Sequence, residues 1–277
     1  MSLERASDTL SSMLVLKNIS KTYGRNKVLE DISFRIHPKE FVCITGPSGA
    51  GKSTLLHLMI GAESASKGSI FVDGVDLRVL PPAILQLFRR RIGVVFQDYK
   101  LLWDRTVAEN VGFPLEVAGA SDAVMEQRVG EVLKEMQLSR RANTMANALS
   151  GGEKARTAIA RSIVHKPIIL FADEPTGNLD PEQTAMVLEL LKQIHKQGTT
   201  VILATHEVDI VDALQTRVIR LEEGRVIRDS VGGYKKGKTE TSTEDTKQSK
   251  HRIFAEEDKE RIEKSTAKKV RITSIGS

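Results

Sequence analysis

One nine-residue segment, 46–54, restricts the fold of this chain more than any other part of its sequence. Gly46, Gly51, Lys52 and Ser53 stand at the positions that a phosphate-binding loop requires. A short apolar run rich in strand-forming residues precedes the segment, and an apolar helical run follows it. A strand, a glycine turn and a helix start direct backbone N–H groups and the helix dipole toward an anion. The segment therefore predicts a nucleotide phosphate site in an α/β fold.

Each part of this segment has a defined task in the predicted site. Lys52 adds a positive charge for the outer phosphates, and the Ser53 hydroxyl is a ligand for Mg²⁺. The plain alternative is a helix start with turn glycines, but the flanking strand and helix favour phosphate binding. The predicted nucleotide contacts in the segment are Gly46, Pro47, Ser48, Gly49, Ala50, Gly51, Lys52, Ser53 and Thr54.

The composition is typical of a globular protein, with 40% hydrophobic and 28% charged residues. The single cysteine, Cys43, lies in the apolar run before the loop, where we expect a small buried side chain. One cysteine cannot form a disulfide within the chain, which fits a reducing compartment. Residues 1–8 lack an apolar signal core, and no stretch reaches the ~18 apolar residues that span a bilayer. If the protein works at a membrane, another protein must cross it.

The net charge of +5 is concentrated at one end of the chain. Residues 232–277 contain twelve Lys or Arg and eight Asp or Glu, and so carry +4 of the total. The remainder is nearly neutral, which argues against a nucleic-acid interface on a basic face. We expect a largely disordered tail with a short helix around 254–264, either a solvated appendage or a segment that contacts anionic lipid or a partner.

Strand and helix patterns alternate along most of the chain, which predicts an α/β fold with a mostly parallel core sheet. Between 101 and 148 helical spacing dominates, so we expect a helical subdomain there. The predicted organisation is an N-terminal extension, 1–12, a nucleotide-binding domain, 13–231, and the charged tail, 232–277. The expected strands are 14–23, 28–36, 41–45, 69–72, 92–96, 168–172, 200–204, 217–221 and 226–228, and the main helices are 55–60, 82–90, 151–165 and 181–196.

Two acidic residues, Asp173 and Glu174, follow a fully apolar strand. A parallel sheet presents such residues to a ligand at its carboxyl edge. One acid there can hold Mg²⁺, usually through water, and the next can orient or deprotonate an attacking water. The alternative is a pair of turn acids that cap the next helix, and the phosphate loop upstream favours the catalytic interpretation.

The run Ser150-Gly151-Gly152-Glu153 has a structural and a functional interpretation. It is a capping box, with Ser150 as N-cap and Glu153 at the third helical position. Two glycines in a first turn lower helix stability, which suggests that something approaches the backbone closely. A hydroxyl and bare N–H groups at a helix start also suit a phosphate. Both interpretations can hold together.

Taken alone, Tyr23, Gln97 and His206 carry little information, because single polar residues at strand ends are usually structural. In order and spacing, however, the phosphate loop, Gln97, 149–153, 168–174, Asn178-Leu179-Asp180 and His206 resemble the ATP-binding cassette (ABC) family across residues 13–228. The resemblance implies an ABC nucleotide-binding domain with a parallel core sheet, an antiparallel β subdomain and a helical subdomain.

The resemblance also implies a Mg²⁺-dependent ATPase that works as a head-to-tail homodimer. ATP would be shared by the phosphate loop of one copy and Ser150, Gly151 and Gly152 of the other. Binding and hydrolysis would then act as a closure switch. In the implied reaction Glu174 is the general base and His206 contacts the γ-phosphate. Ser53, Asp173 and Gln97 contact Mg²⁺, and Gln97 also senses the partner. Asp180 lies across the dimer interface, and Tyr23 stacks on the adenine.

Residues 96–115 favour one branch of the family. The segment Asp104-Arg105-Thr106-Val107 resembles the cell-division ATPases, which serve an FtsX-like integral membrane protein from the cytoplasmic side.

Three alternative functions stay open. The first is the ATPase of a lipoprotein-release or macrolide-type exporter, which shares the run 172–180. The second is a soluble ABC ATPase acting on nucleic acid or the ribosome, although no long insert or second cassette is present. The third is a phosphoryl-transferring kinase, in which 150–153 would have no use.

Two features depart from the family. Lys154-Ala155 follows the capping box where the family commonly has glutamine or another polar residue twice. The phosphate-binding turn is intact, so the change concerns local contacts with a partner. The charged tail is the second departure, since it lies outside the family core.

Overall fold

The structure is a computed structural model that describes residues 12–234 of the 277-residue chain. The predicted N-terminal extension and most of the charged tail, with its predicted disorder and short helix, lie outside the described residues. The chain divides into two compact units. Among the described residues, the first unit contains 12–38, 46–81 and 211–234, and the second contains 39–45 and 82–210.

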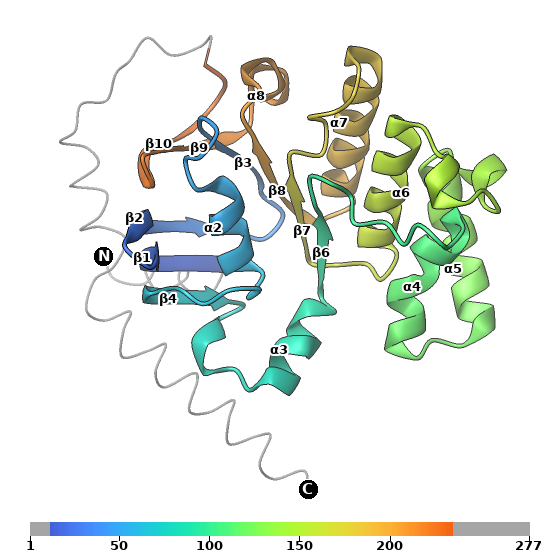
Figure 1. The fold of residues 1–277 in the computed structure, drawn as a ribbon, viewed down its shortest axis with the longest axis horizontal. Helices are drawn as coiled ribbons and strands as arrows, with labels where there is room; N and C mark the ends of the chain where they lie inside the picture. The colour runs from blue at the N-terminus through green and yellow to red at the C-terminus, as the bar shows by residue number, and fades with distance from the viewer. Residues whose placement is uncertain (1–11, 235–277) are drawn as a thin grey trace, which may run out of the picture. The chain divides into compact units, whose positions relative to one another are not determined.

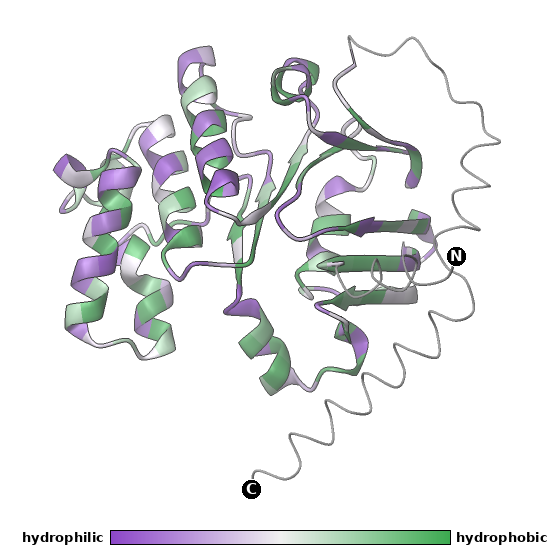
Figure 2. Cartoon of the chain, turned by 180° about the vertical axis from the view of Figure 1, so that it is seen from behind, coloured by the Kyte–Doolittle hydropathy of each residue, from purple (hydrophilic) through white to green (hydrophobic). Residues whose placement is uncertain are grey.

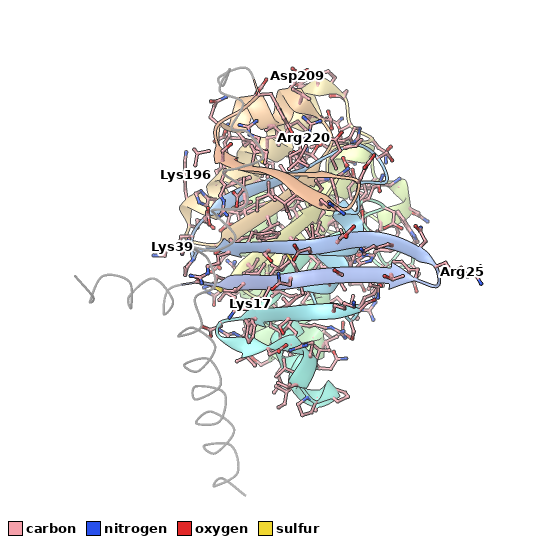
Figure 3. The ribbon with its side chains drawn as sticks, turned by 90° about the vertical axis from the view of Figure 1, so that its left-hand side faces the viewer. Lys17, Arg25, Lys39, Lys196, Asp209 and Arg220 are labelled. Atoms are coloured by element: carbon pink, nitrogen blue, oxygen red, sulfur yellow. The ribbon has the colours of Figure 1, made fainter. Side chains whose placement is uncertain are left out.

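An antiparallel sheet of four strands forms the centre of the first unit. Its order is β2 (Asn26–Ile36), β1 (Leu14–Tyr23), β4 (Lys67–Val72) and β5 (Val75–Asp76). Figure 3 shows these strands side by side, with Arg25 at the β1–β2 turn. Alternate residues such as Leu14, Leu16 and Phe34 are completely buried, as a sheet with one covered face requires. The alternation of apolar and polar residues along each strand therefore determines which face of this sheet is buried.

The first unit also contains the helix that follows the phosphate loop. Helix α2 (Lys52–Met59) contacts β2 and buries Leu55, Leu56, Leu58 and Met59. A hairpin of β9 (Arg217–Glu222) and β10 (Arg225–Val231) pairs antiparallel, and β10 contacts β2. A short 3₁₀ turn, η2 (Leu77–Val79), follows β5. The loop therefore lies between a buried strand and an amphipathic helix in the sequence, as predicted.

Four parallel strands form the centre of the second unit (Figure 1). Their order is β3 (Phe41–Thr45), β8 (Thr200–Thr205), β7 (Ile169–Asp173) and β6 (Ile92–Val95). Every residue of β3, β7 and β8 is buried, which is typical of parallel strands covered on both faces. Because all four run in one direction, their carboxyl ends share one edge. The predicted parallel sheet is confirmed.

Helices flank these strands in the second unit. Helix α6 (Gly151–Ile163) contacts β6, α4 and α7, and α7 (Pro181–Lys196) contacts β8. Figure 2 shows the strands as almost uniformly apolar, whereas α4 to α7 carry both apolar and polar residues. The remaining elements of this unit are α3 (Pro82–Arg89), α4 (Val107–Ala118), α5 (Asp122–Glu135), η3 (Ser139–Arg141) and η4 (Ala146–Ala148).

The helical part that was predicted between 101 and 148 consists mainly of α4 and α5. A fully buried residue, Asn110, holds the segment that leads into α4. Its Oδ1 accepts a hydrogen bond of 2.8 Å from Leu102 N, and its Nδ2 donates to Leu102 O at 2.9 Å and Thr106 O at 3.0 Å. These bonds satisfy a buried amide and fix the loop after β6 on α4.

The sequence patterns missed one helix, α8 (Val208–Leu214). Its seven residues are too few for helical periodicity to be distinguished from a short apolar loop. The two-residue strand β5 was also not predicted; it follows a turn formed by Asp73 and Gly74. Both turn residues have positive φ, 48° and 75°, as a tight hairpin turn between antiparallel strands requires.

Candidate functional site

The phosphate loop owes its shape to glycines. Gly46, Gly49 and Gly51 all have positive φ, of 148°, 81° and 99°. A Cβ atom on Gly46 would lie 2.2 Å from the carbonyl oxygen of Leu221, and one on Gly51 would lie 2.6 Å from Leu29. Larger residues at 46 and 51 would therefore both strain the backbone and collide with neighbours. The loop must be glycine-rich for its conformation as well as for its ligand.

The loop ends where α2 begins, and no described side chain caps this helix. Its N-cap is Gly51, so the first N–H groups are not satisfied by a capping oxygen. Lys52 lies over the loop, where its Nζ donates to the carbonyl oxygens of Gly46 at 2.9 Å and Pro47 at 3.2 Å. Lys52 is only 7% exposed. A buried ammonium at an uncapped helix start is suited to binding an anion.

Tyr23, the predicted adenine-stacking residue, lies at the end of β1 and is 44% exposed. Its hydroxyl donates a hydrogen bond to Glu63, and Lys21 lies against its ring. The hydrogen bond to Glu63, followed by burial, raises the pKa of the Tyr23 phenol, so the hydroxyl stays protonated. The aromatic surface required for stacking is therefore accessible on a fixed ring.

In the second unit, Asp173 is the last residue of β7 and Glu174 follows it. Both are 7% exposed. Glu174 has a φ of 46°, an uncommon conformation for a non-glycine residue, while its N–H still bonds to Ala204 O at 3.0 Å. Such strain is frequently found at functional positions.

The structure brings Glu174 and His206 together. The Nδ1 of His206 lies 2.8 and 2.9 Å from the two carboxylate oxygens of Glu174. His206 follows β8, whose last residue pairs with Thr45 of β3. The side chain of His206 is 57% exposed, whereas that of Glu174 is 9% exposed. The pair thus places a carboxylate beneath an accessible imidazole at the carboxyl edge of the parallel strands.

Gln97 lies two residues after β6 and leads into a strained turn. Tyr99 and Lys100 both have positive φ, of 59° and 48°. Arg161 of α6 donates to the carbonyl oxygens of both residues, at 2.7 and 2.8 Å. The Tyr99 hydroxyl also bonds to Pro175 O at 3.4 Å. Sequence reasoning missed Arg161, because a bond across about sixty residues leaves no local pattern.

The capping box predicted at Ser150 is confirmed. Ser150 Oγ accepts from Glu153 N at 3.4 Å, and Glu153 Oε2 accepts from Ser150 N at 2.9 Å. Arg141 Nε binds the other carboxylate oxygen of Glu153 at 2.7 Å. The bond from Ser150 N and the nearby Arg141 lower the pKa of Glu153, although partial burial opposes them. The N-terminus of α6 is therefore capped by the side chains of Ser150 and Glu153.

The two glycines of this turn lie close to other parts of the same unit. A Cβ on Gly152 would lie 2.0 Å from Oε1 of Gln183 on α7, and one on Gly151 would lie 3.4 Å from Leu179. The close approach that the sequence suggested at Gly152 is thus made within the chain. Asp180 caps α7, since its Oδ1 accepts from Gln183 N at 2.8 Å.

The predicted Mg²⁺ ligands provide a hydroxyl from Ser53, a carboxylate from Asp173 and an amide from Gln97. These are the hard oxygen donors that Mg²⁺ prefers, and Mg²⁺ is commonly bound by few protein groups together with substrate phosphates. Within residues 12–234 there is no group of three or more His, Cys, Asp or Glu that could hold a metal ion. The donor set fits an ion that is bound together with a nucleotide.

Comparison with known proteins identifies the family. The family model described as ABC transporter matches residues 29–177. The cell division ATP-binding protein FtsE of Bacillus subtilis (strain 168) is 46% identical over 222 residues, which cover 80% of this chain and 97% of that protein. The protein of that name from Escherichia coli (strain K12) is 41% identical over 215 residues, which cover 77% and 97%.

A solved structure supports the same assignment. The dimeric structure of a post-hydrolysis state of the ATP-binding cassette MJ0796 bound to ADP and Pi has a TM-score of 0.73 and 36% identity, and the match covers 79% of this chain and 98% of that one. The predicted ABC fold is thereby confirmed. The chain belongs to the ABC transporter family, and within it to the FtsE-like ATP-hydrolysing cassettes.

Proposed function

We propose that this ABC ATPase works in cell division, where ATP-driven closure of a homodimer acts on an FtsX-like integral membrane protein. The observation that carries the proposal is the match to proteins named FtsE over 97% of their length at 41–46% identity. None of the described helices could cross a membrane. On the basis of the match to FtsE, we assign this chain to the cytoplasmic side of the cell membrane, where it binds a partner that crosses the membrane.

The phosphate loop and Tyr23 supply ATP binding in this proposal. Backbone N–H groups of 46–54 and the Lys52 ammonium hold the phosphates, and Tyr23 stacks on the adenine. Ser53, Asp173 and Gln97 would hold Mg²⁺, which neutralises charge on the phosphate oxygens. The buried position of Lys52 at the uncapped start of α2 supports this role, because little rearrangement of the chain is needed when an anion binds.

Glu174 and His206 supply the hydrolytic step. The Glu174 carboxylate accepts a proton from the attacking water, and His206 contacts the γ-phosphate. A hydrogen bond from His206 Nδ1 to Glu174 directs Nε2 of the same ring outward. When both ring nitrogens carry a proton, the Nε2–H can also donate to a phosphate oxygen. Loss of the γ-phosphate removes that contact, which makes the His206–Glu174 pair a sensor of hydrolysis.

The second copy completes the site. Ser150, Gly151 and Gly152 of the second copy contact the ATP held by the first, and Asp180 lies at the dimer interface. The solved relative MJ0796 is described as a dimer bound to ADP and Pi, which supports this arrangement. Since each copy contributes half of two sites, ATP joins two copies and its hydrolysis releases them.

The partner distinguishes cell division from export. We expect this chain, tagged and purified from native membranes with ATP present, to bring with it an integral membrane protein of the FtsX type. Mass spectrometry would identify the protein, and Glu174→Gln should increase the yield because it prolongs the closed state. Recovery of an exporter permease would overturn the cell-division proposal and leave the ATPase assignment intact.

A further inference from the structure

The phenol of Tyr23 and three neighbouring side chains form a cluster. We call it the tyrosine cluster, and its members are Lys21, Tyr23, His57 and Glu63. Glu63 is its centre. One carboxylate oxygen accepts the Tyr23 hydroxyl hydrogen and lies 2.9 Å from Lys21 Nζ, and the other lies 3.4 Å from His57 Nδ1. Three side chains from β1 and α2 therefore converge on a single carboxylate.

Lys21 covers one face of the tyrosine ring. Its Nζ lies 4.7 Å from the ring centroid and donates to Ser64 O at 2.9 Å. The side chain of Lys21 is only 13% exposed, although Tyr23 as a whole is 44% exposed. An ammonium over an aromatic face is attracted by the ring's π electrons. A base that stacks on Tyr23 must therefore approach the opposite face.

Glu63 also joins Tyr23 to the helix that starts at the phosphate loop. The N–H groups of Ala62 and Glu63 bond to His57 O at 2.9 and 3.3 Å, which fixes Glu63 on the last turn of α2. The ring and the phosphate loop are thus attached to one short helix.

We propose that Glu63 and Lys21 are positioning residues for ATP binding. Glu63 fixes the Tyr23 ring at a set distance from the phosphate loop, and Lys21 leaves one ring face for the adenine. The proposal rests on the adenine-stacking role of Tyr23. Because the ring is held in place before ATP arrives, stacking does not require the side chain to be ordered on binding.

The test separates base binding from phosphate binding. We would measure the affinity of the full-length protein for ATP and for inorganic tripolyphosphate, which has no base. Glu63→Ala should weaken ATP binding about tenfold, since the stacking interaction is weakened, and leave tripolyphosphate binding unchanged. The turnover number at saturating ATP should stay close to that of the unmodified protein, so the effect appears in KM rather than in kcat.

Conservative variants keep the test independent of folding. Glu63→Gln keeps an acceptor for the Tyr23 hydroxyl and should recover most of the affinity. Tyr23→Phe keeps the ring without the hydroxyl, and combining it with Glu63→Ala should cost no more than Glu63→Ala alone. Glu30→Ala is the matched control, because Glu30 has similar exposure, pairs with Lys27 and Arg225, and lies on β2 of the same unit.

Three results would overturn the proposal. Equal losses for ATP and tripolyphosphate in Glu63→Ala would show that the cluster only stabilises the fold. Unchanged ATP affinity in Glu63→Ala, with a loss in Tyr23→Ala, would leave the stacking role intact and remove Glu63 from it. If Tyr23→Ala also bound ATP normally, the adenine would be held elsewhere, and the positioning proposal would fail while ATP hydrolysis would be unaffected.

Discussion

Two helix starts in this molecule carry glycines and a hydroxyl residue, yet they are built in opposite ways. Helix α2 begins after Gly51, and no described side chain caps it. Helix α6 begins after Ser150, and a complete capping box closes it, with Arg141 holding Glu153 in place. An uncapped helix start leaves N–H groups for a ligand, whereas a capped start is stable without one. The start of α2 therefore suits binding of a phosphate, whereas the start of α6 is a preformed surface that suits contact with nucleotide held by another copy.

This difference suggests whether ATP binding or dimer closure comes first. In the proposed function a single copy holds ATP phosphates at the start of α2, where Lys52 is already buried over the loop. The turn at Ser150 has its hydrogen bonds in place before any nucleotide arrives. We therefore expect ATP to bind one copy first, and the rigid Ser150 turn of a second copy to close over it.

The largest effect is expected from Glu174, the proposed general base, which belongs to neither helix start. Glu174→Gln should reduce phosphate release by about 10²–10⁴-fold, because the amide cannot accept the proton of the attacking water. ATP binding should be retained. The measurement is steady-state phosphate release at saturating ATP. Glu189→Gln, on the exposed side of α7, is the control, and normal turnover in Glu174→Gln would place the base elsewhere.

Lys52→Ala tests the uncapped start of α2. Removing a charge-assisted contact to phosphate should weaken ATP binding by about 10–100-fold, which corresponds to about 1.5–3 kcal/mol. Titration with a fluorescent ATP analogue measures the change, and Lys192→Ala on α7 is the control. Unchanged affinity would contradict the assignment of the loop.

Ser150→Ala tests the capped start of α6. In contrast to Lys52→Ala, this substitution should not weaken ATP binding. ATP affinity measured at low protein concentration should not change, because in the proposed dimer Ser150 contacts nucleotide held by the other copy. Removing the N-cap oxygen should lower the free energy of unfolding by about 0.5–2 kcal/mol, measurable by urea denaturation. A loss of ATP affinity in single copies as large as that of Lys52→Ala would remove the distinction between the two helix starts.

The smallest effect is a pH dependence at Glu153. Its hydrogen bonds lower the pKa of the carboxyl in the folded state, so they stabilise the protein above the unfolded-state pKa of about 4.3. That stability is lost as the pH falls through the lower folded pKa. Urea midpoints measured from pH 6 to pH 3 should fall less steeply in Glu153→Gln, which keeps the capping geometry. Identical slopes would show that Glu153 contributes nothing to the acid sensitivity.

Local patterns in the sequence were enough to predict both helix starts. The phosphate loop and the capping box each occupy a few consecutive residues, and their spacing defines their geometry. Strand alternation likewise predicted the antiparallel sheet, and apolar runs predicted the buried parallel strands. These features depend on backbone hydrogen bonds and side-chain periodicity, which neighbouring residues determine.

Contacts between distant segments could not be predicted in this way. The contact of Arg161 with the turn after Gln97, the contact of Gln183 with Gly152, and the convergence of the tyrosine cluster on Glu63 all require the folded chain. Glu174 was predicted from its place after an apolar strand and His206 only through resemblance to a family, and their hydrogen bond appeared only in the structure. The positive φ of Glu174 has no sequence signal, since glutamate seldom adopts it.

Sedimentation velocity of Glu174→Gln tests most directly whether a second copy completes the site. The account predicts a dimer with ATP and Mg²⁺, and a monomer with ADP or without nucleotide. Ser150→Ala added to Glu174→Gln should weaken the ATP dimer, because the capped turn then lacks its hydroxyl. A protein that stays monomeric at every concentration while saturated with ATP would contradict the account.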